Sequence, residues 1–177
     1  MDKSPSGQQV EVSWENQRAV VVEVGGGIRL YEVGGRPVLD PYPIDAICDG
    51  AHGTPLIPWP NRLKDGQYHF DGKRYQVPLT EPEKHNAIHG LLRWRPWQIL
   101  RQSAAGATMG IRLFPMQGYP FLLEVGECEI EVLRSDGPGS AKVVRSSFHG
   151  LSADGQLTLV VGKDACGSLN LQRALID

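Results

Sequence analysis

Two short segments of this sequence combine aromatic, cationic and imidazole side chains in a way that suits binding of a small polar ligand. Residues 56–62 read LIPWPNR and residues 85–90 read HNAIHG, with Arg93, Trp94 and Trp97 close behind. A flat Trp face can stack on the C–H face of a sugar ring, while Asn, Arg and His side chains can hydrogen-bond its hydroxyls. Apolar walls with a few placed polar groups would hold such a ligand. The competing interpretation is a Pro-rich loop whose Trp side chains fill the core.

Other patterns that could carry chemistry are weaker. His85 and His89 lie four residues apart, the spacing of two metal ligands on one helix face. A proline just upstream and a glycine directly after predict a loop there instead, so no metal site is expected. Residues 25–27 (GGG) lack the Lys-Ser/Thr of a phosphate-binding loop and predict a hairpin turn. Ser152 lacks the second glycine of a hydrolase nucleophile motif.

The composition excludes several classes of function. The 177 residues carry 18 Lys plus Arg against 20 Asp plus Glu, a net charge of -2. No strong basic field would therefore steer the chain to nucleic acid or to an anionic membrane. The three cysteines, Cys48, Cys128 and Cys166, are odd in number and far apart, as in a reduced cytosolic protein. We find no apolar run typical of a secretory signal or a membrane span, so the expected location is cytoplasmic.

The elements that must position the candidate residues are strands. Glycine pairs and clusters, and the Asp71-Gly72 dipeptide, are typical of hairpin turns. Six prolines between residues 36 and 61 predict loop or strand edge. The sequence therefore predicts an all-β sandwich or barrel, with one short helix at 169–175. Alternating or β-branched runs predict strands at 10–14, 19–24, 28–33, 68–70, 74–77, 97–100, 108–113, 121–125, 127–133 and 157–161.

The order of the motifs resembles the aldose 1-epimerase (galactose mutarotase) family. The resemblance rests on PLIPWPNRL at 55–63, GQYHFDGKRY at 66–75 and NAIHG at 86–90, and it extends roughly over residues 10–134. It implies an all-β, antiparallel β-sandwich, an incomplete galactose mutarotase-like supersandwich. The cleft of this fold binds a monosaccharide, an aldohexose such as glucose or galactose. It also implies an isomerase that interconverts the α and β anomers by acid/base ring opening, without a cofactor. A base removes the anomeric hydroxyl proton and an acid protonates the ring oxygen.

Carried over position by position, the resemblance assigns sugar binding to Arg62, with Asn61 beside it. It makes His89 a catalytic residue, the first of the family's two active-site histidines, acting near the ring oxygen. We add Trp59 and Trp94 as candidate stacking platforms from the residues themselves, with a plain core role as the alternative for each.

The resemblance stops before the family's remaining catalytic groups. The second histidine belongs to a His-Pro-Tyr motif that does not occur here, and His149 is followed by Gly and Leu. Neither Asp154 nor Asp164 has the context of the family's aspartate, and its general-base glutamate finds no counterpart. We therefore expect two parts: residues 1–134, the N-terminal part of a mutarotase-like β-sandwich, and residues 135–177, a divergent tail.

Three other interpretations stay open. A hexose-6-phosphate mutarotase relative would need extra cationic groups at the cleft, for which Arg93 and Arg95 are the clustered candidates; otherwise they form a solvated basic loop. A non-catalytic carbohydrate-binding module would keep Arg62 and His89 without the acid and base. A gene product that does not fold stably is the third. The expected partner is a monosaccharide, with no nucleic acid and no membrane, and the sequence leaves the oligomeric state unknown.

Overall fold

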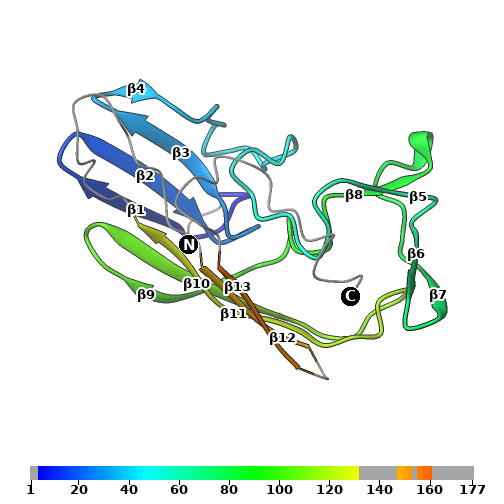
Figure 1. Cartoon of the computed structure of the whole chain (residues 1–177). Coiled ribbons are helices and arrows are strands. Elements are labelled where there is room, and N and C mark those ends of the chain that lie inside the picture. Colours follow the sequence, from blue (N-terminus) through cyan, green and yellow to red (C-terminus); the bar gives the residue numbers. More distant parts are fainter. Residues whose placement is uncertain (1–3, 132–146, 153–154, 161–177) are drawn as a thin grey trace.

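Two antiparallel β-sheets face each other and form the body of the molecule (Figure 1). The computed structural model describes residues 4–131, 147–152 and 155–160. The first sheet has the order β1-β2-β3-β4 and the second β13-β12-β11-β10-β9. The first sheet contains β1 (Gln9–Trp14), β2 (Gln17–Val22), β3 (Ile28–Val33) and β4 (Arg36–Pro37); the second contains β9 (Gln98–Gln102), β10 (Gly106–Leu113), β11 (Leu123–Glu131), β12 (Ser147–Ser152) and β13 (Gly155–Val160).

The hydrophobic core lies between these two sheets. Along β1, Val10 and Val12 are buried while their neighbours face outward, which is the period-two pattern of a half-buried strand. Leu92 and Trp97 fill the same core from the segment between the sheets. The predicted sandwich is thus confirmed. Its buried cluster consists of Val10, Val12, Ala19, Val21, Tyr31, Ile57, Leu92, Trp97, Ala107, Met109, Leu113, Val125 and Ile130.

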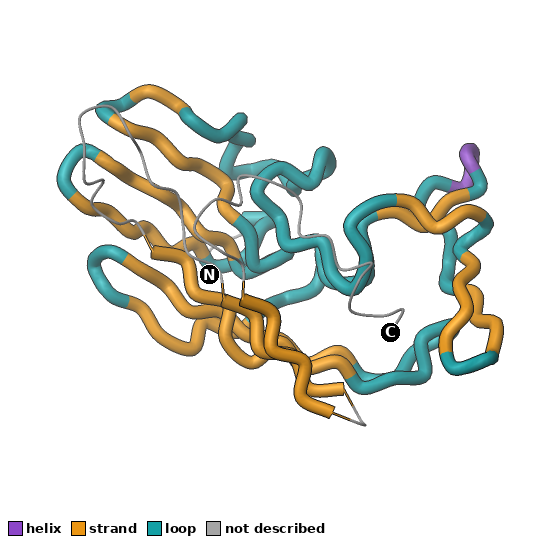
Figure 2. Tube along the Cα trace, in the orientation of Figure 1, coloured by secondary structure: helices purple, strands orange, loops and turns teal. Residues whose placement is uncertain are grey.

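Four further strands form two small ladders beside the sandwich. β5 (Arg62–Lys64) pairs with β8 (Asn86–Ile88), and β6 (Gln67–Phe70) pairs with β7 (Lys73–Gln76). A 3-10 helix, η1 (Pro82–Lys84), precedes β8. Figure 2 shows these pieces as an arm that extends away from the two sheets. No helix among residues 4–131, 147–152 and 155–160 is long and apolar enough to cross a membrane.

An aromatic cluster fastens the arm to the far end of the second sheet. Tyr68 stacks on Tyr75 with 5.2 Å between ring centroids, and the Phe121 ring meets Phe70 and Tyr75 edge-on. The Tyr68 hydroxyl donates to the Gly118 carbonyl at 2.8 Å. Burial raises the pKa of the Tyr68 hydroxyl, so it stays protonated and able to donate at neutral pH.

The predicted hairpins are confirmed where the turn chemistry was strongest. Phe70 pairs with Lys73 across Asp71 and Gly72, which have φ of 49° and 68°. Positive φ at both central residues is the signature of the turn that Asp-Gly favours. The glycine cluster at 25–27 connects β2 to β3, as expected of a hairpin. The prediction of mostly loop for residues 36–61 is likewise confirmed, since only β4 at a sheet edge interrupts it.

Other local predictions need correction. The two strands expected at 121–125 and 127–133 form the single strand β11, because a bulge opposite Gly110 absorbs Gly126 without breaking the ladder. The loop expected at 85–90 contains β8, whose pairing with β5 overrides the breakers around it. The strand expected at 157–161 corresponds to β13. The helix expected at 169–175 lies outside the described residues, and so does the predicted boundary after residue 134.

Candidate functional site

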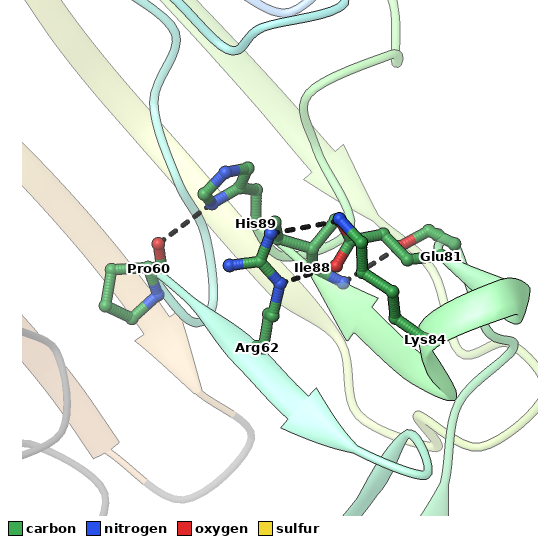
Figure 3. A network of polar contacts seen from close by, with 7 residues as sticks. Pro60, Arg62, Glu81, Lys84, Ile88 and His89 are labelled. Carbon is green, nitrogen blue, oxygen red and sulfur yellow. Dashed lines mark hydrogen bonds and ion pairs between the residues drawn. The ribbon is translucent and has the colours of Figure 1, made fainter.

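The β5–β8 ladder brings three of the predicted site residues together. Arg62 pairs with Ile88 in the antiparallel register, so His89 follows directly after the residue opposite Arg62. The backbone N–H of His89 donates to the carbonyl of Asn61 at 3.0 Å, which extends the ladder by one residue. Figure 3 shows the polar contacts that Arg62 and His89 make, with Glu81 and with Pro60 respectively. Asn61, Arg62 and His89, 28 positions apart at most, thus form one end of a two-stranded ladder.

The His89 ring is held by a backbone carbonyl. Its Nδ1 lies 2.9 Å from the oxygen of Pro60, and the ring is half-buried. A carbonyl oxygen can only accept, so Nδ1 carries the proton in this contact. In the neutral ring the lone pair then sits on Nε2. His89 therefore presents Nε2 as an acceptor for a hydroxyl proton, or as a donor once the ring is protonated.

The backbone behind His89 is fixed by a close approach to Ile57. His89 and Gly90 have φ of 63° and 75°, and Gly90 forms an isolated parallel bridge with Ile57. The N–H of Leu91 donates to the Ile57 carbonyl at 2.7 Å. A Cβ at position 90 would overlap that carbonyl group, so only glycine fits there. This contact sets where the imidazole stands relative to Arg62.

Arg62 is engaged by a carboxylate that the sequence analysis did not single out. Its Nε donates to Glu81 Oε2 at 2.6 Å, and its Nη2 donates to Glu81 Oε1 at 3.0 Å. Lys84 Nζ approaches the same Oε1 at 3.3 Å. The hydrogen bond from Arg62, assisted by Lys84, lowers the pKa of Glu81 to about 2, and the pKa of Arg62 is raised. Glu81 is therefore ionised at neutral pH.

The side chains of Asn61 and of the two Trp candidates are placed differently. Asn61 is exposed, and its described contact is made by its backbone. Trp59 is partly buried, and its Nε1 has no hydrogen-bond partner within the described part of the chain. Trp94 is 45% exposed, and its Nε1 donates to the Cys48 carbonyl at 3.4 Å. The Arg93 guanidinium carbon lies 4.2 Å from the Trp94 ring centroid and covers one of its faces. Their roles as stacking platforms stay predictions.

The arginines that a phosphorylated sugar would need do not form a solvated loop together. Arg93 is 7% exposed, and its Nη2 donates to the Asp49 carbonyl. Desolvation lowers its pKa, and its Nε finds no partner among the described residues. The interpretation of Arg93 as a solvated basic residue is therefore wrong, because its side chain is buried and hydrogen-bonds the Asp49 carbonyl. Arg95 is exposed and lines a separate hollow of about 370 Å³ with Pro96 and residues 111–116.

The described residues do not bring together a set of metal ligands. Within residues 4–131, 147–152 and 155–160, no group of three His, Cys, Asp or Glu side chains lies close enough to hold an ion. His85, the other histidine of the pair, is the exposed C-cap of η1 and has φ of 53°. The two histidines flank a strand rather than share a helix face, so their spacing brings no shared ligand geometry.

The fold assigns the chain to a class of all-β proteins with known members. Solved structures of galactose mutarotase-like proteins share its antiparallel sheets, at sequence identities that establish the fold alone. A putative aldose 1-epimerase from Escherichia coli K12 superimposes with a TM-score of 0.64 at 19% identity, over 82% of this chain and 46% of that one. A galactose 1-epimerase from Lactobacillus acidophilus NCFM gives a TM-score of 0.57 at 17% identity, over 88% and 51%.

Sequence comparison gives the family. The family model for aldose 1-epimerase matches residues 8–126, and the chain belongs to the aldose 1-epimerase family. The uncharacterized protein YihR of Escherichia coli K12 is 39% identical over 118 residues, which are 67% of this chain and 38% of that protein. The chain spans half or less of the length of most of these relatives. The match therefore establishes the family through the part of the chain that carries Arg62 and His89.

Proposed function

We propose that this chain binds an aldohexose such as glucose or galactose at Arg62, Asn61 and His89, and promotes interconversion of its α and β anomers. The observation that carries the proposal is the β5–β8 ladder, which holds a cationic donor and an imidazole with an available Nε2 at the same end of one pair of strands. Family membership supplies the reaction class. The free, buried thiol of Cys48 agrees with a cytoplasmic setting for this activity.

The chemistry asked of these groups follows from their donors and acceptors. In the proposed complex, Arg62 donates to sugar oxygens and compensates charge that develops as the ring opens. His89 holds one ring proton against Pro60, so its Nε2 exchanges a proton with the substrate or hydrogen-bonds the ring oxygen. Re-closure of the open aldehyde after rotation about its C1–C2 bond gives the other anomer.

A second candidate, a sugar-binding module without catalysis, is favoured by one observation. Ring opening needs a base and an acid, and the carboxylate that the described residues bring to Arg62 is Glu81. A carboxylate with a pKa of about 2 is a poor proton acceptor at neutral pH. A site built on Arg62 and His89 alone would therefore bind a sugar more readily than it would interconvert its anomers.

Polarimetry separates these two candidates. Fresh α-D-galactose is followed at neutral pH in low phosphate, with and without the purified protein. Intrinsic Trp fluorescence is titrated with the same sugar in parallel. Acceleration together with binding supports the epimerase, binding without acceleration supports the module, and folded protein that does neither contradicts both.

The matched variants are chosen for the unusual backbone at the site. His89→Asn removes the imidazole but keeps a residue that tolerates positive φ, which alanine does less well. His85→Asn is the control, because His85 is exposed and has φ of 53°. We expect His89→Asn to reduce any acceleration by roughly 10² or more, and His85→Asn to leave it unchanged. Equal rates in both variants would remove His89 from the site.

A further inference from the structure

The arginine at the site has a partner whose geometry is more than an exposed ion pair. Glu81 meets Arg62 with both carboxylate oxygens, at 2.6 Å to Nε and 3.0 Å to Nη2. This fork-to-fork arrangement fixes the plane of the guanidinium as well as its position. The Glu81 side chain is 15% exposed, against 57% for Glu11 in the ion pair of β1 with Arg18. Glu81 is thus the better shielded of the two carboxylates.

Glu81 is itself held in place by β8, the strand that directly precedes His89. Its N–H donates to the Asn86 carbonyl at 2.9 Å, and the Asn86 N–H donates back to the Glu81 carbonyl at 3.1 Å. One residue earlier, Thr80 Oγ1 accepts the Ile88 N–H at 2.8 Å. β8 therefore pairs with β5 on one edge and is bonded by residues 80–81 on the other. The carboxylate, the guanidinium and the imidazole share one backbone frame.

The ion pair leaves a defined set of donors for a ligand. A guanidinium has five N–H groups, and Glu81 accepts from Nε and from one N–H of Nη2. Nη1 makes no hydrogen bond among the described residues. In Figure 3 one guanidinium nitrogen of Arg62 points away from Glu81. The ion pair therefore leaves Nη1 as the free end of Arg62.

We propose that Glu81 is the positioning residue of this site: it orients the Arg62 guanidinium so that Nη1 faces a sugar bound beside His89. This inference rests on the proposed function for the identity of the ligand. Glu81 does not touch the sugar in this arrangement and takes no proton from it. Lys84 contributes charge to the same carboxylate from an exposed position, without contacting Arg62.

The test compares Glu81→Gln, which keeps the shape and removes the charge, with Glu81→Asp, which keeps the charge on a shorter side chain. Lys84→Ala and Glu11→Gln are the controls. The second removes the carboxylate from the Arg18–Glu11 ion pair on the β1–β4 sheet. The first readout is galactose affinity from Trp fluorescence. The second is hydrogen exchange of the Arg62 Nε–H, seen by NMR and assigned through its loss in Arg62→Lys.

We expect Glu81→Gln to weaken galactose binding by about tenfold to a hundredfold, the usual range for a misplaced recognition group. We expect the Arg62 Nε–H to exchange at least about tenfold faster in the same variant, since its acceptor loses its charge. Glu81→Asp should restore most of both losses, and both controls should match the wild type. Rescue by aspartate distinguishes positioning from a structural role, because a shortened packing residue would restore nothing.

Each other outcome has a definite meaning. Unchanged Nε–H exchange in Glu81→Gln overturns the inference, whatever the sugar does. Faster exchange with unchanged galactose affinity also overturns it, because the orientation of Arg62 would then not matter to the ligand. Wild-type protein that binds no sugar contradicts the proposed function instead, and the exchange measurement still decides whether Glu81 fixes Arg62.

Discussion

Replacing Gly90 with alanine tests the backbone that places His89. Gly90 has φ of 75°, and an added Cβ would overlap the Ile57 carbonyl and lie 2.9 Å from the Ile57 nitrogen. The left-handed backbone alone costs a residue with a Cβ about 1–2 kcal/mol. The overlap also forces apart the two segments joined by the Leu91–Ile57 hydrogen bond of 2.7 Å, a further loss of about 1–3 kcal/mol in a buried setting. We expect a total loss of about 2–5 kcal/mol in the free energy of unfolding.

Gly35 supplies the matched control for this variant. Its φ is 76°, nearly that of Gly90, but nothing lies within 4 Å of an added Cβ. Gly35→Ala should therefore show the backbone term alone, about 1–2 kcal/mol. Urea unfolding gives both free energies, and the galactose affinity of Gly90→Ala shows whether the displaced loop moves His89. Equal losses in the two variants would refute the reasoning, because the close approach to Ile57 would then contribute nothing.

Three further predictions concern single contacts. Neutral His89 should show the Nδ1–H tautomer in ¹⁵N NMR, because Nδ1 donates to a carbonyl oxygen; an Nε2–H signal would contradict that bond. The folded-state pKa of Glu81 of about 2 lies below its unfolded value of about 4.3. The contribution of Glu81 to the free energy of unfolding is therefore complete above about pH 4.3 and is lost as the pH falls towards 2. The free energies from urea melts of wild type and Glu81→Gln should converge over that window. Tyr68→Phe should lower the free energy of unfolding by about 1 kcal/mol, while Tyr75→Phe, whose hydroxyl makes no hydrogen bond among the described residues, should not; equal effects would exclude the Tyr68 contact as the cause.

Local turn chemistry explains which parts of the fold the sequence predicted well. Asp71-Gly72 forms the expected hairpin because both residues accept positive φ at little cost, and this preference does not depend on distant contacts. The break expected near Gly126 was wrong for the complementary reason. A glycine in a strand ends it or enters a bulge according to its partner strand, here Gly110 on β10, and the partner is set by tertiary packing.

The candidate site was predictable only where one residue type carries the signal. Arg93, Trp94 and Trp97 lie within five positions, yet Trp97 is fully buried, Arg93 is buried against the Asp49 carbonyl, and Trp94 is half exposed. The sequence does not indicate which of these three side chains the loop around Cys48 and Asp49 contacts. Glu81 was missed because it lies 19 residues from Arg62, a separation that matches no helix or strand periodicity. The contact between Glu81 and Arg62 is set by β8, which pairs with β5 on one edge and is hydrogen-bonded by residues 80–81 on the other.

The site geometry and the sandwich are built from different contacts, and this separates binding from catalysis. The hydrogen bonds that fix Asn61, Arg62, Glu81 and His89 all run between residues 57 and 91. They stay within this one segment of the chain, and the second sheet contributes none of them among the described residues. The sugar recognition that we propose for Arg62 and His89 would therefore depend on the local ladder, whereas the proposed ring opening would depend on an acid and a base that must reach the same sugar. For this chain, galactose affinity tests the role of the ladder in binding. The anomerisation rate tests whether an acid and a base also reach the sugar.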